Sequence, residues 1–326
     1  MKTLFALLFL SACAVSAATE DKINKTFTVS PGGDLVVEVG FGSIEVVADP
    51  GRSDVNVDVW RKITRSNTSD EEAYLKEHPV EITQDGNTVT LRALGNTQFS
   101  WSWFGAWRNR NEAHYVVHLP EKFATKLKTS GGQIAVSNVS GSVNTDTSGG
   151  GLRFANTHGS INGHTSGGSI KVADCDGDIH INTSGGGIDV SGGGGTLHGN
   201  TSGGGITIKT FNGPIEIGTS GGGITVESIQ GPIKGHTSGG SVHAILLTPI
   251  TSDIDLSTSG GGIHVKVSAN AAFALDAETS GGGVSSDLPV TVQGNIGRNH
   301  LKGTVNSGGP SVRLHTSGGS INVQKL

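Results

Sequence analysis

The sequence predicts an all-β fold, a single-stranded parallel β-solenoid (β-helix) whose coils hold about 18 residues and two strands each. The first observation behind this prediction is a Thr-Ser-Gly-Gly tetrad that recurs along the C-terminal two-thirds of the chain. Seven successive tetrads begin 18 residues apart, at Thr129, Thr147, Thr165, Thr183, Thr201, Thr219 and Thr237. The tetrad returns at Thr258, Thr279 and Thr316, with a variant at Asn306. A fixed period of this length is typical of an array in which each unit stacks on its neighbour.

The second observation is the alternation of apolar and polar residues within each repeat. In residues 165–182, Ile170 and Val172 form one alternating pair, and Ile179 and Ile181 form another. Period-two alternation indicates a half-buried strand, so one repeat contains two short strands. The tetrad forms one corner between them, and a column of glycines forms the other, at Gly141, Gly159, Gly177, Gly195, Gly213 and Gly231. Two strands and two corners make one coil of a flattened solenoid, and successive coils pair as parallel strands.

The same alternation predicts which side chains point inward. The tetrad threonine falls on the inward side, so we expect its hydroxyl to bond to a backbone group of the corner. The outward position of the first strand varies freely, as a solvent face does, at Arg153, Lys171, Asp189, Thr207, Thr225, His243 and His264. We assign residues 127–326 to this solenoid domain.

Residues 18–126 do not keep the period and are expected to form an irregular β region that caps the solenoid. Strands are predicted at 35–39, 42–46, 54–59 and 115–119, and a hairpin joins 80–82 to 89–91 through an Asp-Gly turn. A capping box at Ser69 predicts one short helix that ends by His78, before Pro79. Such a region would cover the first edge of the solenoid, which would otherwise promote aggregation.

The other end shows no cap in sequence. The chain finishes as a strand, Ile321 to Leu326. We therefore expect the last coil to be blunted only by Lys325, or to be covered by another subunit in an oligomer formed through this uncapped coil.

The N-terminus has the features of an export signal. Lys2 precedes the apolar run Leu4 to Leu10, and small residues follow, up to Ala17. Two alternatives stay open: a signal peptide over residues 1–17, or a lipoprotein signal over residues 1–12 with acylation of Cys13. Both predict an exported protein of the periplasm or cell envelope, and the second anchors it to a membrane. No later stretch approaches 18 apolar residues, so no spanning helix is expected.

Composition argues against several partners and chemistries. With a net charge of −5 the chain is mildly acidic and lacks the stripe of basic residues that nucleic-acid binding needs. Nucleic acid is therefore not an expected partner. Cys175 lies in an inward column and is interpreted as a buried thiol that fills space. His180 and His198 share a column one coil apart, as do His243 and His264, but two imidazoles without a third ligand make a weak metal site. We expect no metal and no cofactor.

Catalysis is not expected either. Asp and Glu are scattered, no column stacks them, and Ser and Thr follow the corner pattern without aligned His or Asp partners. No catalytic residue is therefore assigned.

The most pointed local feature is an aromatic and basic segment. Its candidate partner-binding residues are Trp101, Trp103, Phe104, Trp107, Arg108 and Arg110. As an exposed loop it would contact a membrane surface, a glycan or a protein. As an alternative, the aromatic side chains pack over the end of the solenoid as a hydrophobic lid.

The approach Val116-Val117-His118-Leu119-Pro120, followed by Leu127-Lys128-Thr129-Ser130-Gly131-Gly132-Gln133-Ile134, resembles the bacterial putative-adhesin family. The resemblance covers about residues 27–326. It implies a parallel β-solenoid at the cell envelope and supplies no catalytic residues.

The leading hypothesis is an exported, non-enzymatic β-solenoid that binds an envelope or surface partner, which is a protein, a glycan or a membrane surface. The alternatives are a carbohydrate-active β-helix enzyme, which requires a groove with at least two carboxylates, and a purely structural envelope spacer.

Overall fold

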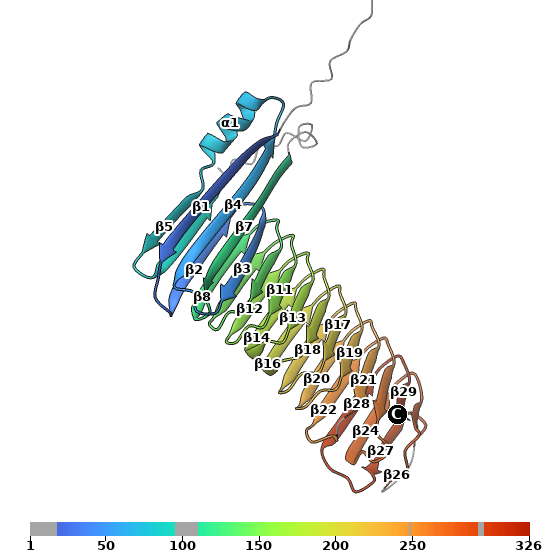
Figure 1. The fold of residues 1–326 in the computed structure, drawn as a ribbon. Helices are drawn as coiled ribbons and strands as arrows, with labels where there is room; N and C mark the ends of the chain where they lie inside the picture. The colour runs from blue at the N-terminus through green and yellow to red at the C-terminus, as the bar shows by residue number, and fades with distance from the viewer. Residues whose placement is uncertain (1–17, 95–109, 248, 293–296) are drawn as a thin grey trace, which may run out of the picture.

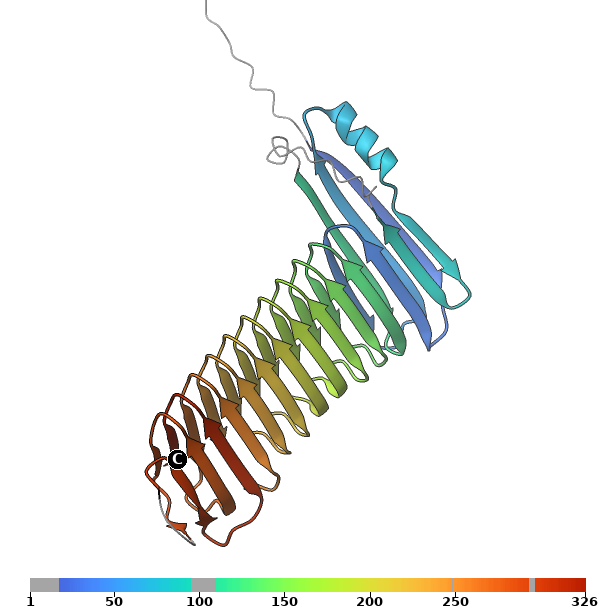
Figure 2. The same cartoon turned by 180° about the vertical axis from the view of Figure 1, so that it is seen from behind.

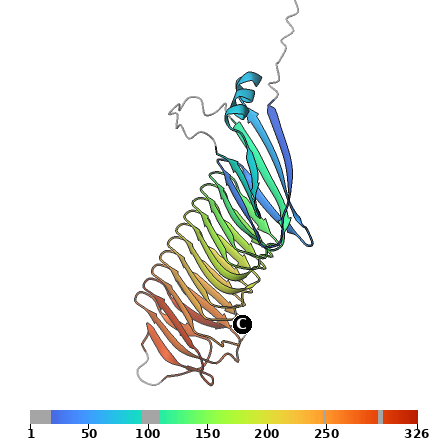
Figure 3. The ribbon, with the colours of Figure 1, turned by 90° about the vertical axis from the view of Figure 1, so that its left-hand side faces the viewer.

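The computed structural model describes residues 18–94, 110–247, 249–292 and 297–326. These residues form an elongated stack of coils, with the only helix of the described part at one end and the C-terminal strands at the other (Figures 1 and 2). Seen from the side, the coils follow one another along the whole stack (Figure 3). The all-β solenoid prediction is confirmed. No helix among the described residues is long and apolar enough to cross a membrane.

Two sheets face each other across the core, and each coil contributes strands to both. Sheet A runs, in spatial order, through β1 (Thr19–Thr28), β4 (Asp54–Thr64), β7 (Arg110–Pro120), β3 (Ser43–Asp49), β9 (Ile134–Ser137), β11 (Leu152–Ala155), β13 (Ile170–Ala173), β15 (Ile188–Ser191), β17 (Ile206–Lys209), β19 (Ile224–Glu227), β21 (Val242–Leu246), β23 (Ile263–Val267), β29 (Ile321–Lys325) and β25 (Val284–Ser286). Sheet B runs through β26 (Val290–Thr291), β27 (His300–Val305), β24 (Phe273–Thr279), β28 (Ser311–Thr316), β22 (Ile254–Thr258), β20 (Ile233–Thr237), β18 (Ile215–Thr219), β16 (Gly194–Thr201), β14 (Asp176–Thr183), β12 (Ile161–Thr165), β10 (Val143–Thr147), β8 (Phe123–Thr129), β2 (Gly33–Val39), β6 (Thr88–Ala93) and β5 (Glu81–Asp85).

The central coils stack in sequence order with parallel strands. Each residue pairs with the residue 18 positions later, as Ile170 does with Ile188 in sheet A and Ile161 with Ile179 in sheet B. Their inward side chains are buried and form one continuous aliphatic core. Because the period of the sequence equals one coil, equivalent residues form straight columns along the stack.

The tetrad closes one corner through its threonine and its second glycine. Thr165 is buried, and its hydroxyl donates to the carbonyl oxygen of Gly150 in the preceding coil at 2.7 Å. The same Oγ1 accepts from the backbone N–H of Gly168 at 3.2 Å. A Cβ on Gly168 would overlap the carbonyl group of Gly150, so only glycine allows the coils to approach this closely. The inward threonine predicted from sequence is confirmed.

At the N-terminal end the sequence order of the coils is broken. Strands β2 and β3 lie between the first regular coil (β8 and β9) and the strands β6 and β7, which come later in the chain. Beyond them the outermost strands are antiparallel: β5 pairs with β6, β4 with β7 and β1 with β4. The predicted strands and the hairpin through Gly86 are confirmed.

Helix α1 (Thr68–Glu77) lies against this end and ends before His78, as predicted. Its N-cap is Asn67 and not the expected Ser69: the Asn67 side chain accepts from the backbone N–H of Asp70 at 2.9 Å. Glu71 lies in the first turn of this helix and is buried. Its carboxylate accepts hydrogen bonds from the backbone N–H groups of Thr19 and Arg65 and from the Thr19 hydroxyl.

At the C-terminal end the expectation of an uncapped last coil is wrong. The final coil, β28 and β29, is inserted between the coil of β22 and β23 and the coil of β24 and β25. Neither Lys325 nor another subunit is needed to cover it. Strand β27 pairs antiparallel with β24, and the short β26 follows at the edge. The chain thus returns from its outermost coil to fill a gap in the stack.

Candidate functional site

The exposed face of sheet B carries a row of charged side chains of alternating sign near the C-terminal end. In spatial order the row is Lys302, Asp276, Arg313, Asp255, Lys234 and Glu216, and each residue is the direct cross-strand partner of the next. We call these six residues the charge ladder. His198 and then His180 continue the same row toward the middle of the stack.

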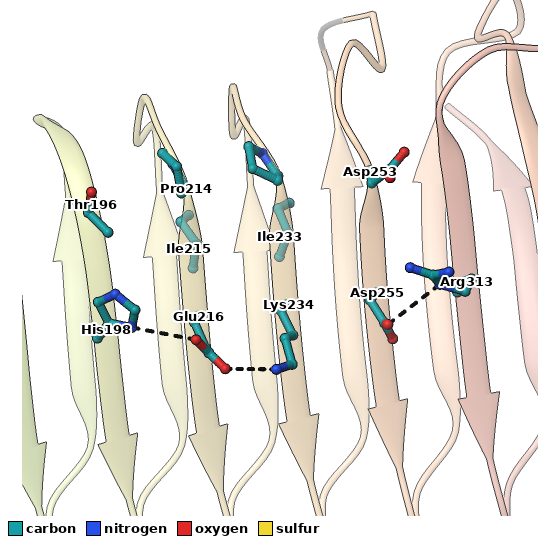
Figure 4. A pocket seen from close by; sticks show the side chains of 11 residues that line it. Thr196, His198, Pro214, Ile215, Glu216, Ile233, Lys234, Asp253, Asp255 and Arg313 are labelled. Atoms are coloured by element: carbon teal, nitrogen blue, oxygen red, sulfur yellow. Dashed lines mark hydrogen bonds and ion pairs between the residues drawn. The ribbon is translucent and has the colours of Figure 1, made fainter.

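Ion pairs join the ladder residues two by two, and two of these three pairs are drawn in Figure 4. Lys234 Nζ lies 2.9 Å from Glu216 Oε1, and Arg313 Nε lies 3.6 Å from Asp255 Oδ2. Lys302 Nζ lies 2.7 Å from Asp276 Oδ2. The side chains of the ladder are between 33% and 70% exposed, so the charges are presented to solvent and are available to a partner.

A shallow hollow of about 320 Å³ lies beside the ladder. Pro214, Pro232 and Asp253 line it on one side, and the row of side chains from His198 to Arg313 lines it on the other (Figure 4). These residues lie on or next to the sheet B strands β16, β18, β20, β22 and β28. The surface is rigid because the inward side chains of the same strands are packed in the core. The site therefore combines a small apolar floor with an ordered row of charges.

The ion pairs favour the charged forms of Glu216, Lys234 and Asp276. The hydrogen bond from Lys234 and its positive charge lower the pKa of Glu216, and the same contact raises the pKa of Lys234. Partial burial raises the pKa of Asp276, but hydrogen bonds from Lys302 and His300 outweigh it and the net pKa is lowered.

The hollow contains several carboxylates, but it does not arrange them as a glycosidase does. Glu216, Asp253 and Asp255 all line it, but in the cross-strand row Lys234 separates Glu216 from Asp255. A glycosidase needs one carboxylic acid with a raised pKa to protonate the leaving group. Here the pKa of Glu216 is lowered, and Asp253 Oδ1 accepts from the backbone N–H of Ser311 at 2.8 Å. The arrangement suits charge recognition better than acid catalysis.

The ladder could not be found from the repeat alone. Stacked in sequence order, the coils would place Asp255 next to Asp276, and two carboxylates would be adjacent. The inserted final coil places Arg313 between them. The available sequence signal was the alternation of Glu216, Lys234 and Asp255 at equivalent positions of successive repeats.

The histidine pairs are adjacent, as their shared columns predicted. The rings of His180 and His198 stack with centroids 4.7 Å apart, and those of His243 and His264 with centroids 5.1 Å apart. Within the described ranges, no three or more His, Cys, Asp or Glu residues gather as a metal site would require.

Cys175 is buried, as expected, and burial raises the pKa of its thiol. Such a thiol is a poor nucleophile, because little thiolate forms near neutral pH.

The residues predicted to bind a partner or a lipid lie almost wholly outside the described part of the chain. Trp101, Trp103, Phe104, Trp107 and Arg108 belong to residues 95–109, and Cys13 belongs to residues 1–17. Arg110 begins strand β7, and only its backbone is described. The aromatic segment and the acylation site remain predictions.

A family model described as Toastrack DUF4097 matches residues 41–324. Among solved structures, the chain is similar to a putative cell adhesion protein from Clostridium sporogenes, with 14% identity, 94% of this chain and 100% of that chain covered, and a TM-score of 0.20. It is also similar to a putative adhesin from Bacteroides fragilis, with 12% identity, coverages of 94% and 97%, and a TM-score of 0.29. A third is a putative lipid binding protein from Parabacteroides distasonis, with 13% identity, coverages of 93% and 96%, and a TM-score of 0.35.

No curated protein matches the chain. The family match spans most of the sequence, from just before β3 to within β29. The chain belongs to the Toastrack DUF4097 family.

Proposed function

We propose that this chain is an exported, non-enzymatic, adhesin-like module of the cell envelope that binds a partner protein through the exposed face of sheet B. The charge ladder is the observation that carries this proposal. It places six charges in fixed positions on a rigid surface, beside a hollow with an apolar floor. Ordered charges of this kind give specificity for a partner with the complementary pattern.

The alternation of sign favours a protein over a membrane surface or a polyanionic glycan. Anionic lipids and polyanions attract surfaces on which Lys and Arg gather without carboxylates between them. In the ladder each cation has a carboxylate neighbour, so the row as a whole carries no net charge. A protein surface can offer both signs at the spacing of the strands.

Two further elements of the proposal come from the sequence. Export rests on the N-terminal signal, processed near Ala17 or at Cys13. The aromatic segment around Trp101, Trp103 and Trp107 would provide a second contact with the partner.

The binding proposal can be tested by co-sedimentation of the purified protein with envelopes isolated from the producing cells. Lys234→Glu reverses one ladder charge and should release most of the bound protein. Lys171→Glu is the matched control, because Lys171 is an exposed lysine on β13 in sheet A, and it should bind as the unchanged protein does. Equal binding by both variants would contradict a role for this face. No binding by any form would favour the structural spacer, and turnover of an envelope glycan would favour the enzyme.

A further inference from the structure

The charge ladder is complementary to its own reverse. It has an even number of members that alternate in sign, so the row begins with the cation Lys302 and ends with the carboxylate Glu216. Reading the row backwards therefore gives a carboxylate wherever reading it forwards gives a cation. A surface with this property can pair with a second copy of itself.

A two-fold axis along the strand direction, passing between β22 and β28, brings two such faces together in this way. It reverses the order of strands in the second copy and keeps each row of outward side chains opposite the same row. Lys302 then faces Glu216 of the second copy, Asp276 faces Lys234, and Arg313 faces Asp255. Each contact occurs twice, as a symmetric interface requires.

The two outward rows that flank the ladder obey the same symmetry. On the proline side, the rotation places Thr304 opposite Pro214, Ala274 opposite Pro232 and Ser311 opposite Asp253. On the other side, it places His300 opposite Gly218, Glu278 opposite His236 and His315 opposite Ser257. No like charges meet in either row, and Glu278 gains an imidazole neighbour. The rotation also lays Lys302 and Thr304 of one copy over the proline-lined hollow of the other.

We propose that the partner of this face is a second copy of the same chain, bound face to face with its strand order reversed, an assignment that rests on the binding role proposed above. Charge complementarity along the ladder, with no like charges opposed in the two flanking rows, selects this occupant. An arrangement that keeps the strand order, without an offset between the copies, would place each ladder residue opposite the same residue of the second copy. Repulsion between like charges opposes that arrangement.

The interface is small and electrostatic. Six strands about 4.8 Å apart and three outward rows cover on the order of 600 Å² per copy, which is at the low end for specific complexes. The dimer is therefore a reversible one whose formation depends on concentration. It should weaken as salt rises from low ionic strength toward about 1 M, because the exposed charges are then screened.

Two single charge reversals and their mixture test the pairing. Lys234→Glu places a glutamate opposite Asp276 at both contacts of the homodimer, and Asp276→Lys places a lysine opposite Lys234. Each variant alone should sediment as a monomer in analytical ultracentrifugation under conditions where the unchanged protein is a dimer. In an equimolar mixture, one copy of each variant restores opposite charges at both contacts, so a dimer should reappear.

Lys171→Glu is again the control and should dimerise like the unchanged protein. Circular dichroism and the melting temperature establish that each variant is folded, and the mixture provides the decisive result even if both variants are somewhat destabilised. The proposal is overturned if the unchanged protein is monomeric throughout, if either single variant remains dimeric, or if the mixture stays monomeric. If dimerisation fails while envelope binding still depends on Lys234, the partner is a different protein and the binding role stands.

Discussion

The middle of the stack and its two ends are built by different rules. Between β10 and β20 each coil follows the previous one in sequence and in space, and every strand pair of that part is parallel. At both ends one coil is inserted out of order, and antiparallel pairs appear at the sheet edges, in both sheets at the N-terminal end and in sheet B at the C-terminal end. The comparison teaches that a repeating sequence specifies how coils stack, whereas closing the stack requires segments that leave the repeat.

The composition of the buried core differs in the same way. In the described central coils the buried polar side chains are threonines of the corners and strands. At the N-terminal end the core also contains Arg61 and Glu71, and burial raises the pKa of Tyr115 to about 12. Charged side chains thus tie the non-repeating strands in place, Arg61 by bonding to Asp21 and Glu71 by bonding to Thr19, whereas the repeating coils use the threonine hydroxyls of their corners.

The largest expected effect comes from removing the inserted C-terminal coil. Deleting residues 306–326 removes β28, which pairs with both β22 and β24. It also removes β29, which pairs with both β23 and β25. Hydrogen exchange should show that residues 254–286 lose protection while the central coils keep it. Deleting β1, an edge strand that among the described strands pairs with β4 alone, is the comparison and should leave all coils protected. Unchanged exchange in residues 254–286 would show that the insertion is not needed to hold this end.

The next largest effect is a difference in stability loss between alanine substitutions at two adjacent glycines of one central corner. Gly168→Ala should lower the free energy of unfolding by about 3 kcal/mol, because its Cβ would overlap the backbone of the coil before it. Gly167→Ala should change it by less than about 1 kcal/mol, because the nearest atom to its Cβ would be 3.5 Å away. Denaturant titration measures both, and similar losses would contradict the close stacking at this corner.

A smaller effect distinguishes the ends by pH. Hydrogen bonds from the backbone of Arg65 and from Thr19 lower the pKa of Glu71. Its ionised form therefore stabilises the N-terminal end above the pKa of an unfolded glutamate, about 4.3. That contribution is lost as the pH falls through the lower folded pKa. Strand β1 should lose exchange protection below about pH 4 before the central coils do.

Glu71→Gln is the control for that acid response. It should make β1 less protected at neutral pH and reduce the dependence on pH, leaving the contribution of Glu20, whose pKa is lowered by hydrogen bonds from Trp60 and Lys22. Equal acid sensitivity of β1 and β14 would count against a specific role for Glu71.

The smallest effect concerns one threonine hydroxyl in the middle. Thr165→Val keeps the shape of the side chain and removes the hydrogen bonds with Gly150 and Gly168. We expect a loss of about 1–2 kcal/mol in the free energy of unfolding. Thr207→Val, at an outward position of β17, should cost less than about 0.5 kcal/mol. Comparable losses at both positions would argue against the inward hydrogen bonds.

Much of the fold was predictable because one coil equals one sequence period. The strands, the inward threonines, the corner glycines and the capping helix all followed from local patterns. The order of coils at the ends did not, because any coil can stack on any other when all carry the same inward residues. The tetrad at Thr316 gives no sign that its coil lies beside that of Thr258. For the same reason the charge ladder could not be predicted from the sequence. The alternation of sign over its six residues depends on where the strand of Arg313 is inserted.

The most direct test of the account is analytical ultracentrifugation of Lys234→Glu, Asp276→Lys and their equimolar mixture. The charge ladder, the inserted coil that completes it and the two-fold pairing together predict monomers for each variant and a dimer for the mixture. A mixture that stays monomeric, or a single variant that stays dimeric, would contradict the self-complementary face.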